Sequence, residues 1–119
     1  MILENEILRL LPADPALAPR AAAYYIRNRA FLRPFEPERP PAFFTPEAQR
    51  GILLREMLDA QSGRAYCFYI EPKCAPALLI GGIGLNNVVW GAFCSAFLGY
   101  KLDAAYTGQG YMTEAVRLV

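Results

Sequence analysis

The 119-residue sequence predicts an α/β (α+β) domain with a mixed, mostly antiparallel sheet flanked by helices, in the order β-α-α-β-β-β-α. Three observations lead to this class. The pairs Asp14-Pro15 and Thr45-Pro46 each precede a segment with helical apolar spacing. Between residues 65 and 102, apolar and aromatic runs alternate with short turn-forming segments, as in consecutive antiparallel strands. A glycine loop then leads into a final amphipathic run.

The N-terminal part is predicted to form one strand and one helix. Ile7–Leu11 alternates imperfectly in hydrophobicity and stops at a proline, as a first strand would. Asp14 and Pro15 then cap a helix that runs to about residue 28. We expect Tyr24 and Tyr25 to pack in the core rather than to contact a substrate. The buried stripe predicted for this helix is Ala21, Ala22, Tyr25 and Ile26.

The segment between the two predicted helices is rich in proline and phenylalanine. Four prolines between Phe31 and Thr45 exclude a regular helix and indicate a stiff loop with aromatic anchors. Thr45 then starts the second helix, with a proline in its first turn, and Ser62-Gly63 ends it. The apolar residues of that helix are Ile52, Leu53, Met57 and Leu58.

Three strands are predicted to follow the second helix. The first, Ala65–Glu71, is joined by a turn over residues 72–76 to a second strand from 78 to about 88. The glycines at 81, 82 and 84 within that second strand predict a bulge or the close approach of another backbone. A turn near Trp90 leads into the third strand, Phe93–Leu102.

A glycine loop and a final helix close the sequence and carry its main functional prediction. From Gly108 onward, Met112, Ala115, Val116 and Val119 recur at helical spacing. The first N–H groups of a helix lack intrahelical acceptors and lie at the positive end of its dipole, so the loop can receive an anion. A Walker loop needs Gly-Lys-Ser/Thr, which is absent, and a Rossmann fingerprint needs a small residue at Thr113 and a later acidic residue.

Composition excludes several classes of function. Twelve basic and eleven acidic residues give no field for nucleic acid or an anionic membrane, and no apolar run is long enough to span a bilayer. Without a basic N-terminal signal region, a cytoplasmic location is the expectation. The three cysteines are scattered, so we predict no disulfide framework and no metal site. Because the chain has no histidine, any proton transfer must use a carboxylate, tyrosine, backbone or water.

Two motifs resemble the GNAT acetyltransferase superfamily, whose coenzyme A loop is written Gln/Arg-x-x-Gly-x-Gly/Ala. Aligned on that pattern, Thr107 takes the Gln/Arg place, Gly110 the first required glycine and Met112 the last small position. The run from Gly84 to Asp103, followed by Tyr106-Thr-Gly-Gln-Gly-Tyr-Met-Thr-Glu-Ala, is similar to the ribosomal-protein-alanine (RimJ/RimL-like) branch. Weaker similarity extends back to Asn28, so most of the chain is covered.

The resemblance implies acetyl-CoA as cosubstrate and a primary amine as acceptor, most simply a protein N-terminal α-amine. The strand before the loop would bond the pantetheine amides, and the backbone of the loop would hold the phosphates. The implied cofactor residues are Tyr100, Lys101, Leu102, Gly108, Gln109, Gly110, Tyr111, Met112 and Thr113. The implied acceptor-side residues are Arg33, Phe35, Phe44 and Asn86. For the aromatic ones the alternative is hydrophobic pinning of the loop.

No catalytic base is assigned by the sequence. Candidates are Glu36 and Glu38 in the proline loop, Asp103 at the strand end, and Tyr100 and Tyr106. Exposed carboxylates and aromatic packing explain each of them equally well. The glutamate at 114 is expected on the solvated face of the last helix. A neutral α-amine needs little help, because its pKa near 8 leaves about a tenth of it neutral at pH 7.

The sequence is expected to be a single, partial domain over residues 1–119, because the superfamily continues with a further strand, helix and hairpin. The strand ending at Leu102 would then expose an open edge that favours self-association as a homo-oligomer. Two alternatives to an active acetyltransferase therefore stay open. One is a catalytically impaired fragment that binds coenzyme A, and the other is a self-associating structural module.

Overall fold

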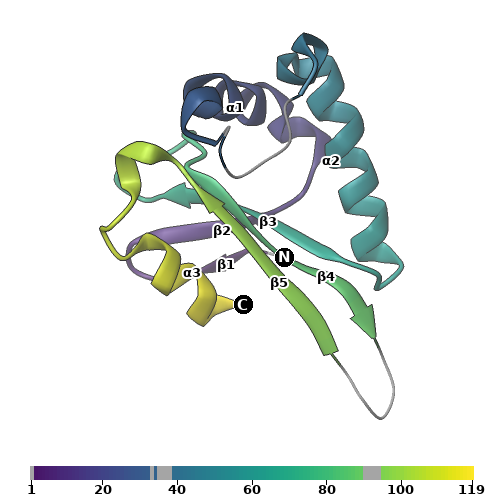
Figure 1. Ribbon diagram of the computed structural model, residues 1–119. Coiled ribbons are helices and arrows are strands. Elements are labelled where there is room, and N and C mark those ends of the chain that lie inside the picture. The colour runs from purple at the N-terminus through teal and green to yellow at the C-terminus, as the bar shows by residue number, and fades with distance from the viewer. Residues whose placement is uncertain (1, 33, 35–38, 90–94) are drawn as a thin grey trace.

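The computed structural model describes residues 2–32, 34, 39–89 and 95–119 (Figure 1). Within them, the strands form one antiparallel sheet in the order β1-β2-β3-β4-β5. The strands are β1 (Leu3–Glu4), β2 (Leu8–Pro12), β3 (Tyr66–Pro72), β4 (Gly81–Val89) and β5 (Ser95–Leu102). The α-helices are α1 (Ala18–Leu32), α2 (Pro46–Gln61) and α3 (Tyr111–Leu118), and the short 3-10 helices are η1 (Pro15–Leu17), η2 (Pro41–Phe44) and η3 (Ala104–Tyr106). The predicted order of elements is confirmed, with β1 added; the turn expected near Trp90 lies outside the described residues.

The helices cover opposite faces of the sheet. Successive strand residues point to opposite faces, and cross-strand partners share one. Tyr69 of β3 packs with Leu53 of α2 and Ala18 of α1, whereas its neighbours Phe68 and Ile70 share a core with Ala115 of α3. Figure 1 shows the same arrangement, with α1 and α2 on one side and α3 on the other. The sheet therefore has one face that packs against α3 and an opposite face that packs against α1 and α2.

The predicted helix starts are confirmed at atomic detail. The Asp14 side chain accepts the N–H of Ala16 at 2.8 Å, and the Thr45 hydroxyl accepts the N–H of Ala48 at 3.3 Å. Asp14 caps η1, which continues into α1. Ser62 and Gly63 end α2 as expected, with Gly63 at a φ of 74°. These ends depend on local chemistry, which explains why the sequence predicts them.

The buried faces of α1 and α2 differ in part from the prediction. Ile26 is 60% exposed, and Tyr24 is buried instead, because α1 also packs against the aromatic segment before α2. There Phe43 and Phe44 pack on Tyr24, Tyr25 and Leu32. Of the apolar residues predicted to be buried on α2, Leu53 is fully buried, whereas Leu58 is 51% exposed.

The glycines of β4 have two different roles. A Cβ at Gly81 would collide with the Lys101 carbonyl, so the predicted close approach of another backbone is confirmed at that position. A Cβ at Gly82 would make only ordinary contacts, at 3.5 Å from the Phe68 carbonyl and 3.8 Å from Lys101 Cε. The irregular register lies further along, between Asn86 and Val89. The strand itself begins at Gly81, later than predicted.

Helix α3 begins at Tyr111, after Gly110 in the left-handed conformation with a φ of 86°. Ala115 is fully buried, and Tyr111, Met112 and Leu118 pack beside it. Two predictions for this helix are wrong. Val116 and Val119 are 40% and 38% exposed, because the helix turns Leu118 toward the sheet instead. Glu114 is half-buried, and its carboxylate accepts the side-chain amide of Asn5 at 3.2 Å.

Candidate functional site

A buried polar cluster fixes the point where β5 gives way to the glycine loop. The Asp103 carboxylate accepts three hydrogen bonds: from Nε of Arg27 at 2.7 Å, from Nδ2 of Asn28 at 3.1 Å and from the N–H of Ala105 at 2.9 Å. The side-chain oxygen of Asn28 in turn accepts a hydrogen bond from the N–H of Ala104, the next residue of the loop, at 2.9 Å. Both Asp103 and Asn28 are almost completely buried. Helix α1 therefore holds the start of the loop rigidly against the end of β5.

This cluster decides the role of Asp103, one of the candidate bases. Burial alone would raise the pKa of its carboxyl, but hydrogen bonds from Asn28, from the Ala105 N–H and from Arg27 outweigh it, so the pKa lies below its usual range. The carboxylate is thus ionised and fully engaged by donors from its own chain. Asp103 is a positioning residue for the loop, and it does not face a substrate.

The glycine loop presents backbone donors. Gly108 and Gly110 have φ values of 76° and 86°, which L side chains rarely adopt. The first helical bond of α3 runs from the Glu114 N–H to the Gly110 carbonyl at 3.1 Å. Within the described part of the chain, the N–H groups of residues 108–113 have no protein acceptor. Side chains brace the loop from outside: Gln109 Nε2 donates to the Ala105 carbonyl at 2.9 Å.

Strand β5 ends the sheet among the described residues, so one of its edges carries unpaired backbone groups. On its other edge it pairs with β4 from Gly81↔Leu102 to Asn86↔Phe97. The backbone of Tyr100–Leu102 adjoins the glycine loop directly through Asp103. An extended ligand could add to this edge as a strand would.

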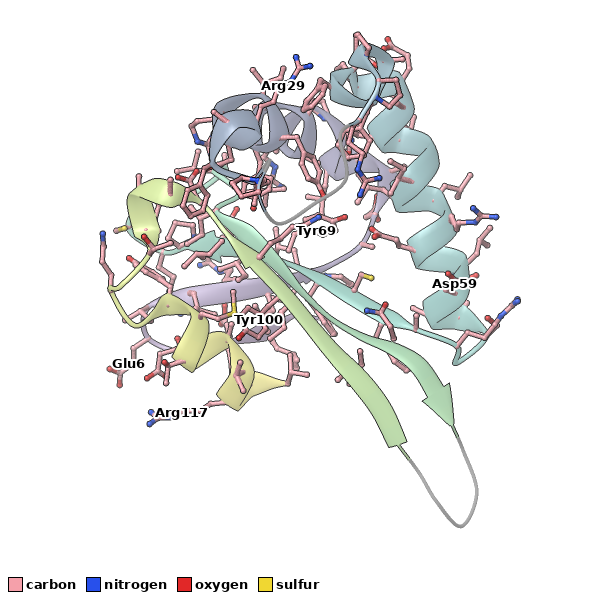
Figure 2. The ribbon with its side chains drawn as sticks, viewed as in Figure 1. Glu6, Arg29, Asp59, Tyr69, Tyr100 and Arg117 are labelled. Carbon is pink, nitrogen blue, oxygen red and sulfur yellow. The ribbon has the colours of Figure 1, made fainter. Side chains whose placement is uncertain are left out.

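A cleft of about 710 Å³ lies around β5 and reaches both faces of the sheet. On the α3 side it is lined by Thr107, Gly108 and Met112. On the side of α1 and α2 it is lined by Phe31, Leu32, Glu56, Cys67 and Tyr69, with glycines of β4 and β5 between them. Figure 2 shows Tyr69 between the sheet and the α1–α2 side, and Tyr100 on β5 toward α3.

The structure brings only some of the predicted site residues into this cleft. Those lining it are Tyr100, Lys101, Leu102, Gly108, Met112 and Asn86. Gln109, Gly110, Tyr111 and Thr113 belong to the same loop and helix start but are not among the described lining residues. Phe44 is not among them either: it stacks edge-on with Phe43 and lies under Arg29, whose guanidinium is 4.6 Å from its ring centre. Arg33, Phe35, Glu36 and Glu38 lie outside the described residues.

The sequence prediction missed the residues that line the α1–α2 side of the cleft. Glu56 follows the buried Leu53 by three positions on α2, so helical spacing already places it toward the sheet. Cys67 and Tyr69 alternate with the α3-side core residue Phe68 along β3. The sequence contains both patterns. It does not show that α2 crosses this part of the sheet.

On this side of the cleft, the Tyr69 hydroxyl and the Cys67 thiol, both protonated, lie next to the Glu56 carboxylate. The Tyr69 hydroxyl donates to Glu56 Oε1 at 2.6 Å. Burial, and then the Glu56 charge, raises the pKa of Tyr69 well above its ordinary value. The same two causes raise the pKa of the Cys67 thiol to about 12. Cys67 is therefore a neutral thiol near pH 7, and it is not a nucleophile of the low-pKa kind.

A model of the acetyltransferase (GNAT) domain family matches residues 7–119. The chain belongs to this family. This GNAT domain is 32% identical over 118 residues to the probable N-acetyltransferase YjcK of Bacillus subtilis, covering 99% of the chain and 65% of that protein. It is 34% identical over 98 residues to the [ribosomal protein uS5]-alanine N-acetyltransferase of Escherichia coli, covering 82% of the chain and 50% of that enzyme.

Solved structures agree with this assignment. The ribosomal-protein-S5-alanine acetyltransferase of Vibrio fischeri superposes with a TM-score of 0.88 at 33% identity, covering 98% of the chain and 63% of that protein. A RimL ribosomal L7/L12 acetyltransferase in complex with coenzyme A shares the fold, with a TM-score of 0.84 at 24% identity over 99% of the chain and 64% of that protein. The GNAT domain thus spans about half to two-thirds of the length of these relatives. None of the helices in its described part has the length and apolar character of a membrane span.

Proposed function

We propose that this GNAT domain binds acetyl-CoA and takes part in transferring the acetyl group to a primary amine, with a protein N-terminal α-amine as acceptor. The observation that carries the proposal is the set of acceptor-free N–H groups over residues 108–113, placed directly after an unpaired strand edge. Together they offer donors for a diphosphate and a backbone ladder for an amide-containing arm.

The loop geometry fits the pyrophosphate of coenzyme A. A Cβ at Gly108 or Gly110 would meet no atom within 4 Å, so these glycines border open space. Positive φ at both residues is a backbone conformation that occurs in anion-binding turns, where neighbouring N–H groups bind phosphate. The motif departures at Thr107 and Met112 matter little here, because the donors are backbone groups. Pantetheine amides would bond to the backbone of Tyr100–Leu102.

The chemistry that this arrangement supports is direct attack of a neutral amine on the thioester carbonyl. A backbone N–H near Leu102 would donate to the oxygen as negative charge develops on it. About a tenth of an α-amine is neutral at pH 7, whereas a lysine side chain with a pKa near 10.4 is almost fully protonated. The α-amine is therefore the acceptor that needs less help from the protein.

The relatives point to the same acceptor class. The Escherichia coli and Vibrio fischeri proteins are named for acetylation of an alanine of a ribosomal protein, and the RimL structure holds coenzyme A. Because each of these proteins is longer than the GNAT domain described here, the turnover of this chain is the part of the proposal that needs a direct assay. Binding of coenzyme A can be tested independently of it.

The test of the coenzyme site is isothermal calorimetry with coenzyme A on the chain and on two matched glycine variants. Gly110→Ala introduces a side chain at a φ of 86°, and we expect coenzyme A affinity to fall about tenfold or more as the loop donors shift. Gly51→Ala makes the same substitution in α2, where the new Cβ meets nothing within 4 Å. We expect unchanged affinity for that control. Equal affinity for both variants, or no affinity in the parent chain, would refute the site.

A further inference from the structure

Three glycines leave a hollow on the face of the sheet that α1 and α2 cover. Gly84 pairs with Gly99 across β4 and β5, and Gly82 pairs with Lys101 in the next pair on the same face. Their β3 partners Cys67 and Tyr69 share that face. Because no side chain rises from these three positions, space remains between the strands and α2, and all three glycines line the cleft.

Glu56 is the charged side chain that α2 contributes to this hollow. It is half-buried, and Tyr69 donates to its Oε1 at 2.6 Å. Its other neighbour on β3, the Cys67 thiol, is also an uncharged donor. Among the described residues, no Lys or Arg nitrogen lies within ion-pair distance of the Glu56 carboxylate.

The two buried carboxylates among the described residues are both paired with arginine. Glu71 is bound by Arg9 at 3.3 Å and by Arg20 at 2.9 Å, and Asp103 is bound by Arg27. A carboxylate withdrawn from water is normally compensated by a cation or by several donors. Lys101 is the cation among the described residues that line the cleft, and its ammonium lies against the hydroxyl and ring of Tyr25. Within the part of the chain that the structure describes, Glu56 therefore has two neutral donors and no cation as partners, and it lines a substrate-sized cleft.

We propose that Glu56 binds the amino group of the acceptor and takes its proton as the amide bond forms. This inference rests on the proposed function, since it assigns the acceptor side of the same cleft. The neutral amine donates an N–H to the carboxylate, and its lone pair attacks the thioester carbonyl carbon. As the C–N bond forms and the C–S bond breaks, the sulfur leaves with the bonding electrons. The proton released by the nitrogen goes to Glu56 and then to the thiolate, so the products are an amide and a thiol.

The rest of the hollow fits this role. Tyr69 is a positioning residue: its hydroxyl fixes one carboxylate oxygen from the rigid sheet side. Phe31 and Leu32 line the same cleft and would contact the apolar part of a first residue such as alanine. The glycine floor leaves space for an extended chain end. Among the described residues, the titratable or charged groups near Glu56, Cys67 and Tyr69 also include Asp59, Lys101 and Tyr25.

Two substitutions separate charge from packing. Glu56→Gln keeps an amide oxygen that can accept the Tyr69 hydroxyl, but it removes the negative charge and the basic site. Glu56→Asp keeps the charge and shortens the reach to Tyr69. If Glu56 served only to hold Tyr69, the aspartate variant would be the more impaired of the two. If Glu56 serves the amine, the glutamine variant is the more impaired.

The experiment uses an alanine-initiated hexapeptide labelled at its C-terminus, with an N-acetylated copy as the blank. Fluorescence anisotropy reports peptide binding to the chain with and without coenzyme A, thiol release reports turnover with acetyl-CoA, and calorimetry reports coenzyme A affinity. We expect Glu56→Gln to weaken binding of the free-amine peptide about tenfold and to lower kcat/KM about tenfold to a hundredfold. Glu56→Asp should fall between Glu56→Gln and the parent. Coenzyme A affinity should stay within about twofold, and Glu6→Gln, in the exposed β1–β2 turn, should match the parent.

The outcomes separate the two proposals. Parent-like binding of the free-amine peptide by Glu56→Gln, or a more impaired Glu56→Asp, overturns the role of Glu56 even if coenzyme A binds normally. Failure of the parent chain to bind coenzyme A overturns the proposed function. The peptide titration without coenzyme A then still decides whether Glu56 recognises an amine. A parent chain that binds the acetylated peptide as tightly as the free one also overturns the inference.

Discussion

Replacing Asp103 by asparagine tests whether the buried cluster holds the glycine loop in place. The carboxylate accepts Nε of Arg27 at 2.7 Å and Nδ2 of Asn28 at 3.1 Å, both at Oδ2, while Oδ1 accepts the Ala105 N–H at 2.9 Å. An asparagine can keep an acceptor at only one of these two oxygen positions. The NH₂ group of the asparagine must then point at other donors, so the hydrogen bonds at that oxygen position are lost: either those from Arg27 and Asn28 or the one from Ala105.

The expected cost follows from the partners that are lost. A hydrogen bond to a charged group contributes about 1.5–3 kcal/mol, and breaking a buried ion pair costs about 3–5 kcal/mol. The Arg27 side chain is 38% exposed, so water compensates part of that loss. We expect Asp103→Asn to lower the free energy of unfolding by about 2–3 kcal/mol, which corresponds to a fall in Tm of about 10 °C for a domain of this size.

Asp14 provides a matched control for this variant. Its side chain also accepts a hydrogen bond from the N–H two residues on, at 2.8 Å, and also caps a 3-10 helix. Asp14 is exposed, however, and no arginine of the described residues pairs with it. Asparagine is as good a cap as aspartate, so Asp14→Asn should cost less than about 0.5 kcal/mol. Urea unfolding of both variants measures the difference. Equal stability of Asp103→Asn and Asp14→Asn would refute the reasoning.

The pH dependence gives an independent check on Asp103. Because its pKa is lower in the folded protein than in the unfolded chain, its contribution is fully present above the unfolded value near 3.9 and is lost as pH falls through the folded value. The stability gap between the parent and Asp103→Asn should therefore be constant from about pH 5 to pH 7. It should close below about pH 4. A gap that persists unchanged to pH 2 would contradict the assignment.

Two further predictions follow from the sheet. Gly81→Ala forces a Cβ into a backbone carbonyl of β5 and should cost about 2 kcal/mol or more, whereas Gly82→Ala meets only ordinary contacts and should stay within about 1 kcal/mol of the parent, as urea unfolding will measure. Similar costs at both positions would show that the strands can adjust. Glu71→Gln weakens its bonds to Arg9 and Arg20, so it should reduce stability at pH 7. Because the pKa of Glu71 is lowered in the fold, thermal scans should show that deficit shrinking below about pH 4, and a deficit that grows there would refute it.

Much of the fold follows from local chemistry that the sequence displays. The caps at Asp14 and Thr45, the end of α2 at Gly63 and the strand-loop-helix order around Gly110 lie where the sequence predicts them. Each depends on hydrogen bonds or dihedral angles within a few residues. The conformation of the glycine loop could be predicted for the same reason, because glycine allows the positive φ angles found at residues 108 and 110.

What the sequence could not supply depends on which surfaces meet. Ile26 and Leu58 have helical apolar spacing, yet they are exposed, because α1 and α2 each cover only part of the sheet. Asp103 was a candidate base until α1 brought Arg27 to it across 76 positions in sequence. Periodicity gives the direction of a side chain on its own element, but not the element that packs against it.

The sequence by itself determined the class of fold, the family resemblance and the strand-glycine loop-helix order, since these depend on short-range pattern. Only the tertiary structure decided that the glycines of β4 and β5 share a face, that Tyr69 fixes Glu56 beside them, and that the hollow and the glycine loop line one cleft. The physical reason is that the behaviour of a carboxylate depends on its burial and on the charges and hydrogen-bond donors around it. Folding brings those groups together from positions far apart in the sequence.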